Sequence, residues 1–351
     1  MLFSHISSKE KILFARYLSI MTKAGMPVLE SLTMIQKQTK ATLFKKILKE
    51  LVQNVSNGQF LSIAFEKYAS LFGPFFINIV KIGETSGTLS ESLSYLTEEL
   101  SKKDELRKKI IGALIYPLVI LFATFGITGL LTVVIFPKII PVFKDLDIAL
   151  PLTTRILIAV SSLLTNYGGY VLLGMVLFCF ALWGILKISQ VRFIAHHWLL
   201  AIPLFGSLVR SYALANFSRT LSILLQSGVT IVEALHIVAE TMGNLVYRQE
   251  FHRLAESIKQ GASLTSYLVA KPKLFPFSLS SLVNVGETTG KLSDTLHLVS
   301  EFYEEEVENT TKNLATTLEP MLIVLMGAVV GFIALSIITP IYQVSQGIKT
   351  Q

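Results

Sequence analysis

Three long stretches of the sequence contain no charged side chain. They cover residues 110–137, 156–186 and 320–348 of the 351-residue chain. Each stretch is longer than the roughly 20 apolar residues that a helix needs to cross the hydrocarbon core of a bilayer. A chain in lipid must satisfy its own backbone hydrogen bonds, so these segments are predicted to be helical. The sequence therefore predicts a membrane protein with three transmembrane helices.

The composition agrees with this prediction. The chain is 52% hydrophobic and only 16% charged, and its mean hydropathy is +0.59. Both values lie outside the usual range of soluble domains. The single cysteine, Cys179, falls inside the second uncharged stretch. A disulfide within one chain and a cysteine-based metal site are therefore excluded.

Most of the chain is an internal duplication at an offset of 203 residues. The segment "GETSGTLSESL", which starts at residue 83, matches "GETTGKLSDTL", which starts at residue 286, at seven of eleven positions. The segment 14–35 aligns with 217–238 at the same offset. Each copy has apolar residues at helical spacing, separated by glycine turns, and no alternating strand pattern. We predict an all-α integral membrane protein with two homologous six-helix cytoplasmic bundles and three transmembrane helices.

The basic residues that flank the uncharged stretches give an orientation. They crowd the entrance to the first stretch and follow the second, which places both repeats in the cytoplasm. The second stretch is longer than one span, so its start is predicted either to lie along the membrane interface or to belong to a tilted helix. The predicted domains are a first bundle (1–111), a first span (112–137), a short external loop (138–155), a second span with an interfacial start (156–187), a second bundle (188–318), and a third span with a short external tail (319–351).

The turn "VGETTGKLSDTL" resembles a phosphate-binding loop because it contains Gly286, Gly290 and Lys291. A Walker loop, however, needs four residues between its glycines and a hydroxyl residue after the lysine. Here the spacing is shorter, leucine follows the lysine, and the first copy of the turn has Thr88 at the lysine position. Nucleotide binding is therefore not predicted at this turn.

The two GET turns are predicted to connect the fifth and sixth helices of their repeats. Their glycines suit a backbone conformation with positive φ. Their glutamates have two open interpretations, which are capping a helix end and contacting a partner. The candidate turn or contact residues are Gly83, Glu84, Gly87, Gly286, Glu287 and Gly290.

The last helices of the two repeats differ in charge. The first carries the basic residues Lys102, Lys103 and Arg107, with Lys108 and Lys109 beside them. The second carries Glu301, Glu304, Glu305 and Glu308 on one helical face. The acidic face has two open interpretations: it is simply solvated, or it docks on a basic surface. That basic surface would belong to the first repeat of the same chain, to the first repeat of a neighbouring chain, or to an outside partner. The basic residues could instead hold anionic lipid headgroups.

Prolines and glycines mark the membrane helices. Pro117 and Pro320 occupy the same repeat position at the entrances of the first and third spans, where they predict a helix start or a kink. Gly327 and Gly331 form a G-x-x-x-G pattern in the third span, which allows close helix packing in lipid.

Several segments resemble the inner-membrane platform proteins of type II secretion and type IV pilus machines, the F-protein/PilC family, which includes competence-pilus members. These segments are the twin GET turns, "ALIYP" at 113–117, "FPKIIPVFKDLDIALPLTTRIL" at 136–157, "IPLFGSLVRSYALANFSRTL" at 202–221 and "LEPML" at 318–322. The resemblance implies a non-enzymatic platform in the bacterial inner membrane. It also implies these partners: a hexameric assembly ATPase, pilin or pseudopilin subunits, other inner-membrane assembly proteins, and further copies of the chain in a dimer or trimer.

Two other classes of function fit the residues less well. An enzyme is disfavoured because the six histidines show no metal-binding spacing and no nucleophile elbow occurs. A small membrane transporter or channel subunit is the alternative, but three spans are few and none has a charged residue near its centre. We therefore predict no catalytic residue, no cofactor, no metal and no direct contact with nucleic acid.

Overall fold

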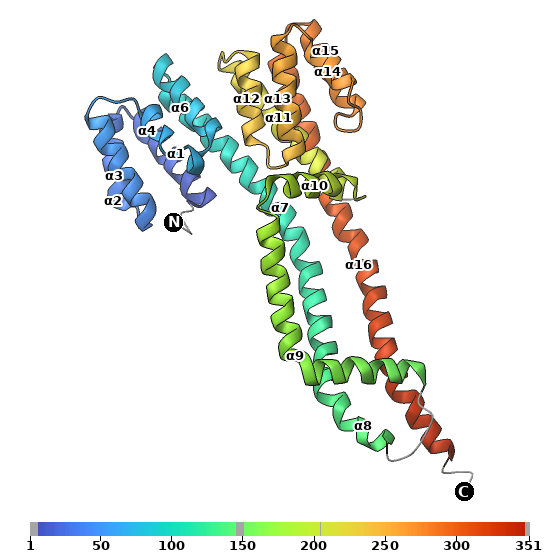
Figure 1. The fold of residues 1–351 in the computed structure, drawn as a ribbon. Helices are drawn as coiled ribbons and strands as arrows, with labels where there is room; N and C mark the ends of the chain where they lie inside the picture. The colour runs from blue at the N-terminus through green and yellow to red at the C-terminus, as the bar shows by residue number, and fades with distance from the viewer. Residues whose placement is uncertain (1–5, 145–150, 204, 348–351) are drawn as a thin grey trace. The chain divides into compact units, whose positions relative to one another are not determined.

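The computed structural model describes residues 6–144, 151–203 and 205–347. Every regular element within these ranges is a helix (Figure 1). The chain divides into two compact units. The bundle unit combines Met1–Lys109 with Phe193–Thr310, and the span unit combines Ile110–Arg192 with Thr311–Gln351.

The first repeat has the expected six helices and one additional helical turn. That turn, α5, ends at Gly73, whose φ of 85° stops the helix before Pro74 begins the next one. The elements are α1 (Ser8–Lys23), α2 (Val28–Gln38), α3 (Thr42–Ser56), α4 (Leu61–Glu66), α5 (Ala69–Phe72), α6 (Pro74–Ser86) and α7 (Leu89–Leu130).

The second repeat has six helices in the same order. They are α11 (Phe205–Gln226), α12 (Ile231–Thr241), α13 (Leu245–Lys259), α14 (Leu264–Val269), α15 (Phe277–Thr288) and α16 (Leu292–Gly347). The predicted fold class, an all-α membrane protein with two homologous helical bundles, is therefore confirmed.

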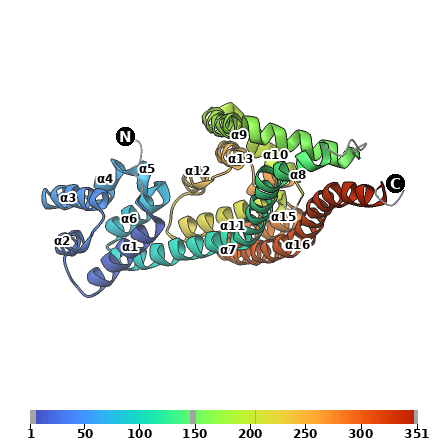
Figure 2. The same cartoon turned by 90° about the horizontal axis from the view of Figure 1, so that it is seen from below.

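Both bundles are built around aromatic side chains, several of which occupy equivalent repeat positions. In the first, where α1, α2 and α3 lie side by side (Figure 2), the ring of Phe14 meets that of Phe44 at 5.7 Å. In the second, the ring of Phe217 stacks on that of Phe251 at 4.5 Å. Tyr247, the repeat equivalent of Phe44, is fully buried and its hydroxyl donates to the Leu274 carbonyl at 2.9 Å. Burial of a tyrosine is tolerated here because its polar end has this partner.

Within the described residues, the span unit contains three helices that are long and apolar enough to cross a membrane. These are the apolar ends of α7 and α16, together with α9 (Leu152–Ile185). Pro117 lies inside α7, and Pro320 lies inside α16. Neither proline starts a helix, so each removes one hydrogen bond from within a continuous helix.

The segment 138–155, predicted as a loop, is helical over most of its described length. After α7 the chain passes through one π-helical turn, η1 (Leu131–Ile135), into α8 (Phe136–Lys144). The next helix, α9, already begins at Leu152. The prediction of a loop was therefore wrong at both ends, and its middle lies outside the described residues.

The start of α9 packs against its neighbours in the span unit through hydroxyl groups. Thr154 donates to the Ser336 carbonyl of α16 at 2.8 Å. Ser161 donates to the Thr132 carbonyl of η1 at 2.7 Å. In a π-helical turn a carbonyl accepts from the N–H group five residues on, and for Thr132 that residue is Pro137, which has no backbone N–H. In Figure 1 these first turns of α9 run across the line of the rest of the helix.

Residues 193–209, which also contain no charged side chain, include a bend. The helix α10 (Ser189–Ala201) and α11 meet at 107°. Gly206 lies at this bend, where a Cβ atom would approach the Leu200 carbonyl oxygen to 2.3 Å. Only glycine fits such a close approach, so this position fixes the entry of the chain into the second bundle.

Candidate functional site

The two glycines of each GET turn have different structural roles. Gly87 and Gly290 have φ of 73° and 70° and end the preceding helix in the left-handed conformation. Gly83 and Gly286 are instead buried inside α6 and α15. A Cβ atom on Gly286 would lie 2.9 Å from the Thr295 Cβ and 3.1 Å from the Leu292 Cα. The first glycine of each turn therefore permits close contact with the next helix.

The glutamate of each turn caps a short helix in its own repeat. The Glu84 carboxylate accepts hydrogen bonds from the backbone N–H groups of Leu61 at 2.6 Å and Ser62 at 2.8 Å, at the start of α4. Glu287 accepts the equivalent pair from Leu264 at 2.8 Å and Thr265 at 3.0 Å, at the start of α14. A carboxylate in this position satisfies N–H groups that have no partner within the helix.

Glu287→Gln is expected to lower the free energy of unfolding by about 1.5–3 kcal/mol, because a charge-assisted bond to two backbone donors becomes a neutral one. The measurement is thermal unfolding of the purified full chain in detergent. Thr265→Val is the matched control, since it removes only the 2.6 Å hydroxyl bond to Glu287. Equal stability of Glu287→Gln and the unchanged chain would contradict this capping role.

A buried ionic cluster joins the two repeats within the bundle unit. Arg219, on α11, places its Nη1 atom 3.0 Å from Oε1 of Glu99 on α7. The same guanidinium donates through Nε and Nη2 to Glu304 on α16. The Arg219 and Glu99 side chains are 10% and 6% exposed. One cation of the second repeat thus bridges the last helices of both repeats.

The burial of this cluster affects the pKa values of its members. Burial raises the pKa of Glu99, and the Arg219 charge only partly opposes this effect. Burial alone would lower the pKa of Arg219, but Glu99 and Glu304 together outweigh it and raise the pKa. The guanidinium therefore stays charged, and it is the group that makes the buried carboxylate of Glu99 tolerable beside the half-buried carboxylate of Glu304.

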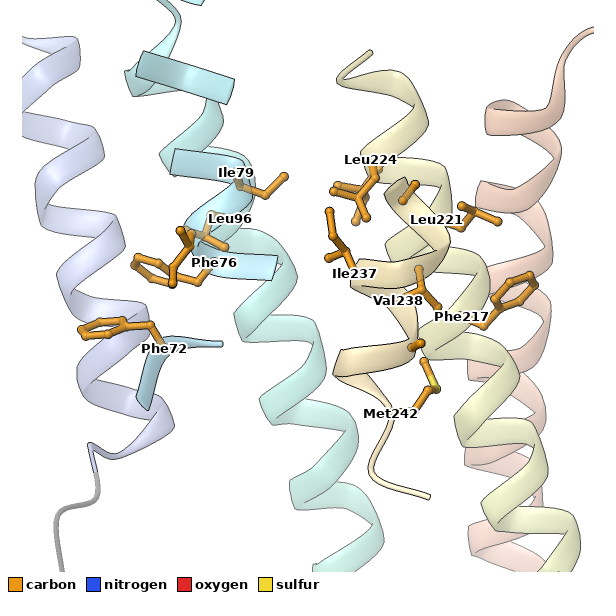
Figure 3. Packing of buried hydrophobic residues seen from close by; sticks show 14 of the residues in the cluster. Phe72, Phe76, Ile79, Leu96, Phe217, Leu221, Leu224, Ile237, Val238 and Met242 are labelled. Atoms are coloured by element: carbon orange, nitrogen blue, oxygen red, sulfur yellow. The ribbon is translucent and has the colours of Figure 1, made fainter. Parts of the chain in front are cut away.

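The repeats also meet through an apolar contact. α6 of the first repeat contacts α12 of the second. In Figure 3, Ile79 of α6 points across the junction towards Ile237 of α12. Both side chains are buried. The ionic cluster and this contact together form what we call the repeat junction.

The charged residues singled out on the last helices have several different partners. Glu308 pairs with Lys109 at 2.7 Å, so the acidic face of α16 does meet the basic stretch of α7 in the same chain. Lys102 pairs with Glu98 of its own helix at 3.0 Å. Glu301 lies 3.6 Å from His297 of its own helix, and Glu305 is exposed.

Lys103 and Arg107 line a cavity of about 410 Å³, together with Lys11.

The G-x-x-x-G pattern of the third span is not used for packing within the described chain. A Cβ atom on Gly327 or Gly331 would meet nothing within 4 Å. Both glycines therefore leave a flat strip on α16 that a neighbouring helix could approach.

Arg219 and Glu99 were not among the residues predicted from the sequence. A signal was present, because Arg219 is the only charged residue between 211 and 232, in a helix that is otherwise apolar or weakly polar. A lone charge in such a helix is rarely buried without a partner. Its repeat equivalent, Arg16, is exposed. The equivalent position in the first repeat therefore gives no indication that Arg219 pairs with Glu99 and Glu304.

Two homologous helical bundles, each ending in a helix that continues into an apolar segment, define a repeat-built, multi-pass membrane protein. Both repeats match the family model of type II secretion system (T2SS) protein F, over residues 14–137 and 217–340. The chain belongs to this family.

Related proteins come from both pilus and secretion machines. The type IV pilus assembly protein PilC of Thermus thermophilus is 37% identical over 98% of this chain and 84% of that protein. The type II secretion system protein F of Pseudomonas aeruginosa is 32% identical over 97% of this chain and 84% of that protein. The type 4 fimbrial assembly protein PilC of Pseudomonas putida is 31% identical over 94% of this chain and 82% of that protein.

Proposed function

We propose that this chain is an inner-membrane platform protein that couples a cytoplasmic assembly ATPase to the insertion of pilin-like subunits into a fibre. The continuity of the last helix of each repeat supports this proposal. α7 extends from Leu89 to Leu130, and α16 extends from Leu292 to Gly347. Because each helix contains both a bundle segment and an apolar membrane segment, a displacement of the bundle moves the membrane segment with it.

The repeat junction adds to this coupling. Arg219 binds α7 and α16 at once, so the two helices that enter the membrane are held by one guanidinium. A force applied to either repeat is then shared by both helices. The names of the relatives, which refer to pilus assembly and type II secretion, agree with such a role.

The proposed partners are those of an assembly machine. They are a hexameric ATPase at the cytoplasmic bundles, pilin or pseudopilin subunits at the spans, other inner-membrane assembly proteins, and further copies of this chain in a dimer or trimer. The platform itself needs no catalytic activity, because the ATPase supplies the energy.

The proposed location is the bacterial inner membrane with the N-terminus in the cytoplasm. The basic residues before the first span and after the second support this orientation. At the end of α9, the Lys187 ammonium lies 3.6 Å above the centre of the Trp183 ring. Tryptophan and lysine are typical of the membrane–water interface, which marks one end of this span.

The coupling can be tested by changing only the stiffness of α7 and α16. A Gly-Gly-Ser-Gly insertion after Ile110 or Thr311 adds a flexible joint between bundle and span, whereas an Ala-Ala-Ala-Ala insertion adds the same length as helix. We expect the glycine insertions to abolish fibre assembly in the host and the alanine insertions to retain part of it. Membrane insertion and ATPase co-purification should be equal in both. Normal fibre assembly with the glycine insertions would contradict the coupling role.

A further inference from the structure

The repeat junction is formed by two non-equivalent faces. The first repeat contributes the α6–α7 face, which we define as Ile79, Ile82, Tyr95 and Glu99. The second repeat contributes the α11–α12 face, which we define as Arg219, Thr220, Ile223 and Ile237. The Arg219–Glu99 ion pair and the contact between α6 and α12 join these two faces. The α6–α7 face and the α11–α12 face are not equivalent positions of the duplication. The junction therefore uses one of these two kinds of face from each repeat.

Each repeat therefore keeps the other face free. In the second repeat, the equivalent of the α6–α7 face is the α15–α16 face, namely Leu282, Val285, Leu298 and Phe302. In the first repeat, the equivalent of the α11–α12 face is the α1–α2 face, namely Arg16, Tyr17, Ile20 and Met34. These equivalences follow from the 203-residue offset of the duplication.

The α15–α16 face is exposed although it remains apolar. Ile79 is 2% exposed at the junction, whereas its equivalent Leu282 is 39% exposed. Glu99 is 6% exposed, whereas its equivalent Phe302 is 47% exposed. Val285 and Leu298 are also exposed. A run of large apolar side chains on the surface of a bundle is typical of an interaction surface.

The α1–α2 face shows the same contrast. Ile223 is 2% exposed, but its equivalent Ile20 is 58% exposed. Ile237 is 7% exposed, but its equivalent Met34 is 37% exposed. Tyr17 and Arg16 are exposed as well. The two free faces are thus the counterparts of two faces that already fit each other within the chain.

The charges at the edge of the repeat junction are complementary, and so are the charges at the equivalent positions of the two free faces. Lys103 and Glu240 line the same cavity at the junction. Their repeat equivalents are Glu306 on α16 and Lys37 on α2, which carry the opposite signs. A contact between the two free faces would therefore again bring one lysine and one glutamate together. It would also bring Arg16 towards Phe302, and a guanidinium over an aromatic face is a favourable contact.

We propose that a second copy of this chain docks its α1–α2 face on the α15–α16 face of the first, so that the repeat junction recurs between chains. Such a contact is heterologous, because each chain uses two different surfaces. Repeating it leads to a ring if the rotation between copies closes, and to an open filament if it does not, rather than to a symmetric pair. The docking requires neither the ATPase nor the pilin subunits, so it stands apart from the proposed coupling and from its test.

Cysteine cross-linking of the full chain in native membranes tests the geometry. With Cys179 replaced by serine, chains carrying Met34→Cys are co-expressed with chains carrying Leu282→Cys. We expect dimers from the mixture and higher oligomers from the double variant, but none from either single variant. The matched control is Ile79→Cys with Ile237→Cys, which should cross-link within one chain. Dimers formed by Leu282→Cys alone would indicate a symmetric contact and overturn the proposal.

A charge exchange provides an independent readout. Lys37→Glu should weaken self-association by about tenfold, measured by sedimentation of the purified chain in detergent, and Glu306→Lys should restore it when both changes are present. Lys37 is exposed and Glu306 is partly exposed, so circular dichroism should be unchanged. Unaltered self-association in both single variants, together with absent cross-links in the mixture, would rule out this interface.

Discussion

Arg219→Gln is expected to destabilise the bundle unit by about 3–5 kcal/mol, which would make it one of the most damaging single substitutions in the chain. The reason is that Glu99 would stay buried without its cation, while Glu304 would lose the same partner. Removing one member of a buried ionic cluster costs more than removing the whole cluster, because an uncompensated charge remains. The measurement is denaturant-induced unfolding of the full chain in detergent.

Glu99→Gln should be far milder. It removes a charge whose burial is unfavourable, and Arg219 keeps its contacts with Glu304. The asymmetry between the two substitutions is the specific expectation. Equal destabilisation by Glu99→Gln and Arg219→Gln would contradict this expectation. It would mean that the Arg219–Glu99 pair itself stabilises the bundle unit, and that Arg219 does not act mainly by compensating the buried charge of Glu99.

The Arg219→Gln variant should also acquire a characteristic pH dependence. Burial already raises the pKa of Glu99, and loss of the arginine removes the effect that opposes it. A group whose pKa is raised on folding stabilises the folded state below its unfolded pKa, and this stabilisation is lost as the pH rises through the folded pKa. The variant should therefore be closer to the unchanged chain at about pH 5 than at about pH 8.

Cross-linking of Ile79→Cys with Ile237→Cys reports on the repeat junction itself. In the Arg219→Gln background, this intrachain cross-link should weaken at the higher pH and recover at the lower one. A cross-link that is equally efficient at both pH values would show that the junction does not depend on the charge of Glu99.

Features with local causes were predictable from the sequence. The spans follow from uncharged stretches, the repeats from the constant offset, and the helix order from glycine and proline positions. The sequence could not separate the roles of the two glycines in each turn. It allowed positive φ at Gly83 or Gly87, whereas only Gly87 adopts it. Gly83 is needed for close approach to Ser92, a contact that depends on the angle between two helices.

The contacts between the repeats were not predictable, because they join residues far apart in the chain. The sequence showed that α7 is basic and α16 acidic, but Lys109 is the residue of the basic stretch that meets Glu308. The duplication identifies equivalent positions, yet it does not indicate which face of one repeat meets which face of the other. That choice depends on the fit of side chains across the junction, as with Ile79 and Ile237 in Figure 3.

For the start of α9, the sequence predicted the general arrangement but not the contacts. The length of the second uncharged stretch indicated that its beginning does not simply extend the span. It did not reveal that Ser161 would donate to the Thr132 carbonyl, because that contact depends on how two helices pack. Hydroxyl residues in an apolar helix indicate polar contacts, but their partners come from packing.

Gly286→Val is expected to destabilise the second bundle by about 3 kcal/mol, at the upper end of the usual cost of overpacking. The added Cβ would lie 2.9 Å from the Thr295 side chain and 3.1 Å from the Leu292 Cα, so a backbone segment must move. A flexible side chain could move aside at low cost, but the first turn of α16 cannot. Thermal unfolding of the full chain in detergent measures the loss.

Two neighbouring substitutions separate close packing from the other roles of this turn. Gly290→Ala meets no atom within 4 Å and costs only the strain of its φ of 70°, about 1–2 kcal/mol. Lys291→Ala should be silent, because Lys291 is exposed at a turn between two helices. Loss of function from Lys291→Ala with an intact fold would restore the idea of a phosphate-binding loop. If Gly286→Val is instead the most damaging of the three, the turn serves to position α16, the helix that continues from the second bundle into the third span.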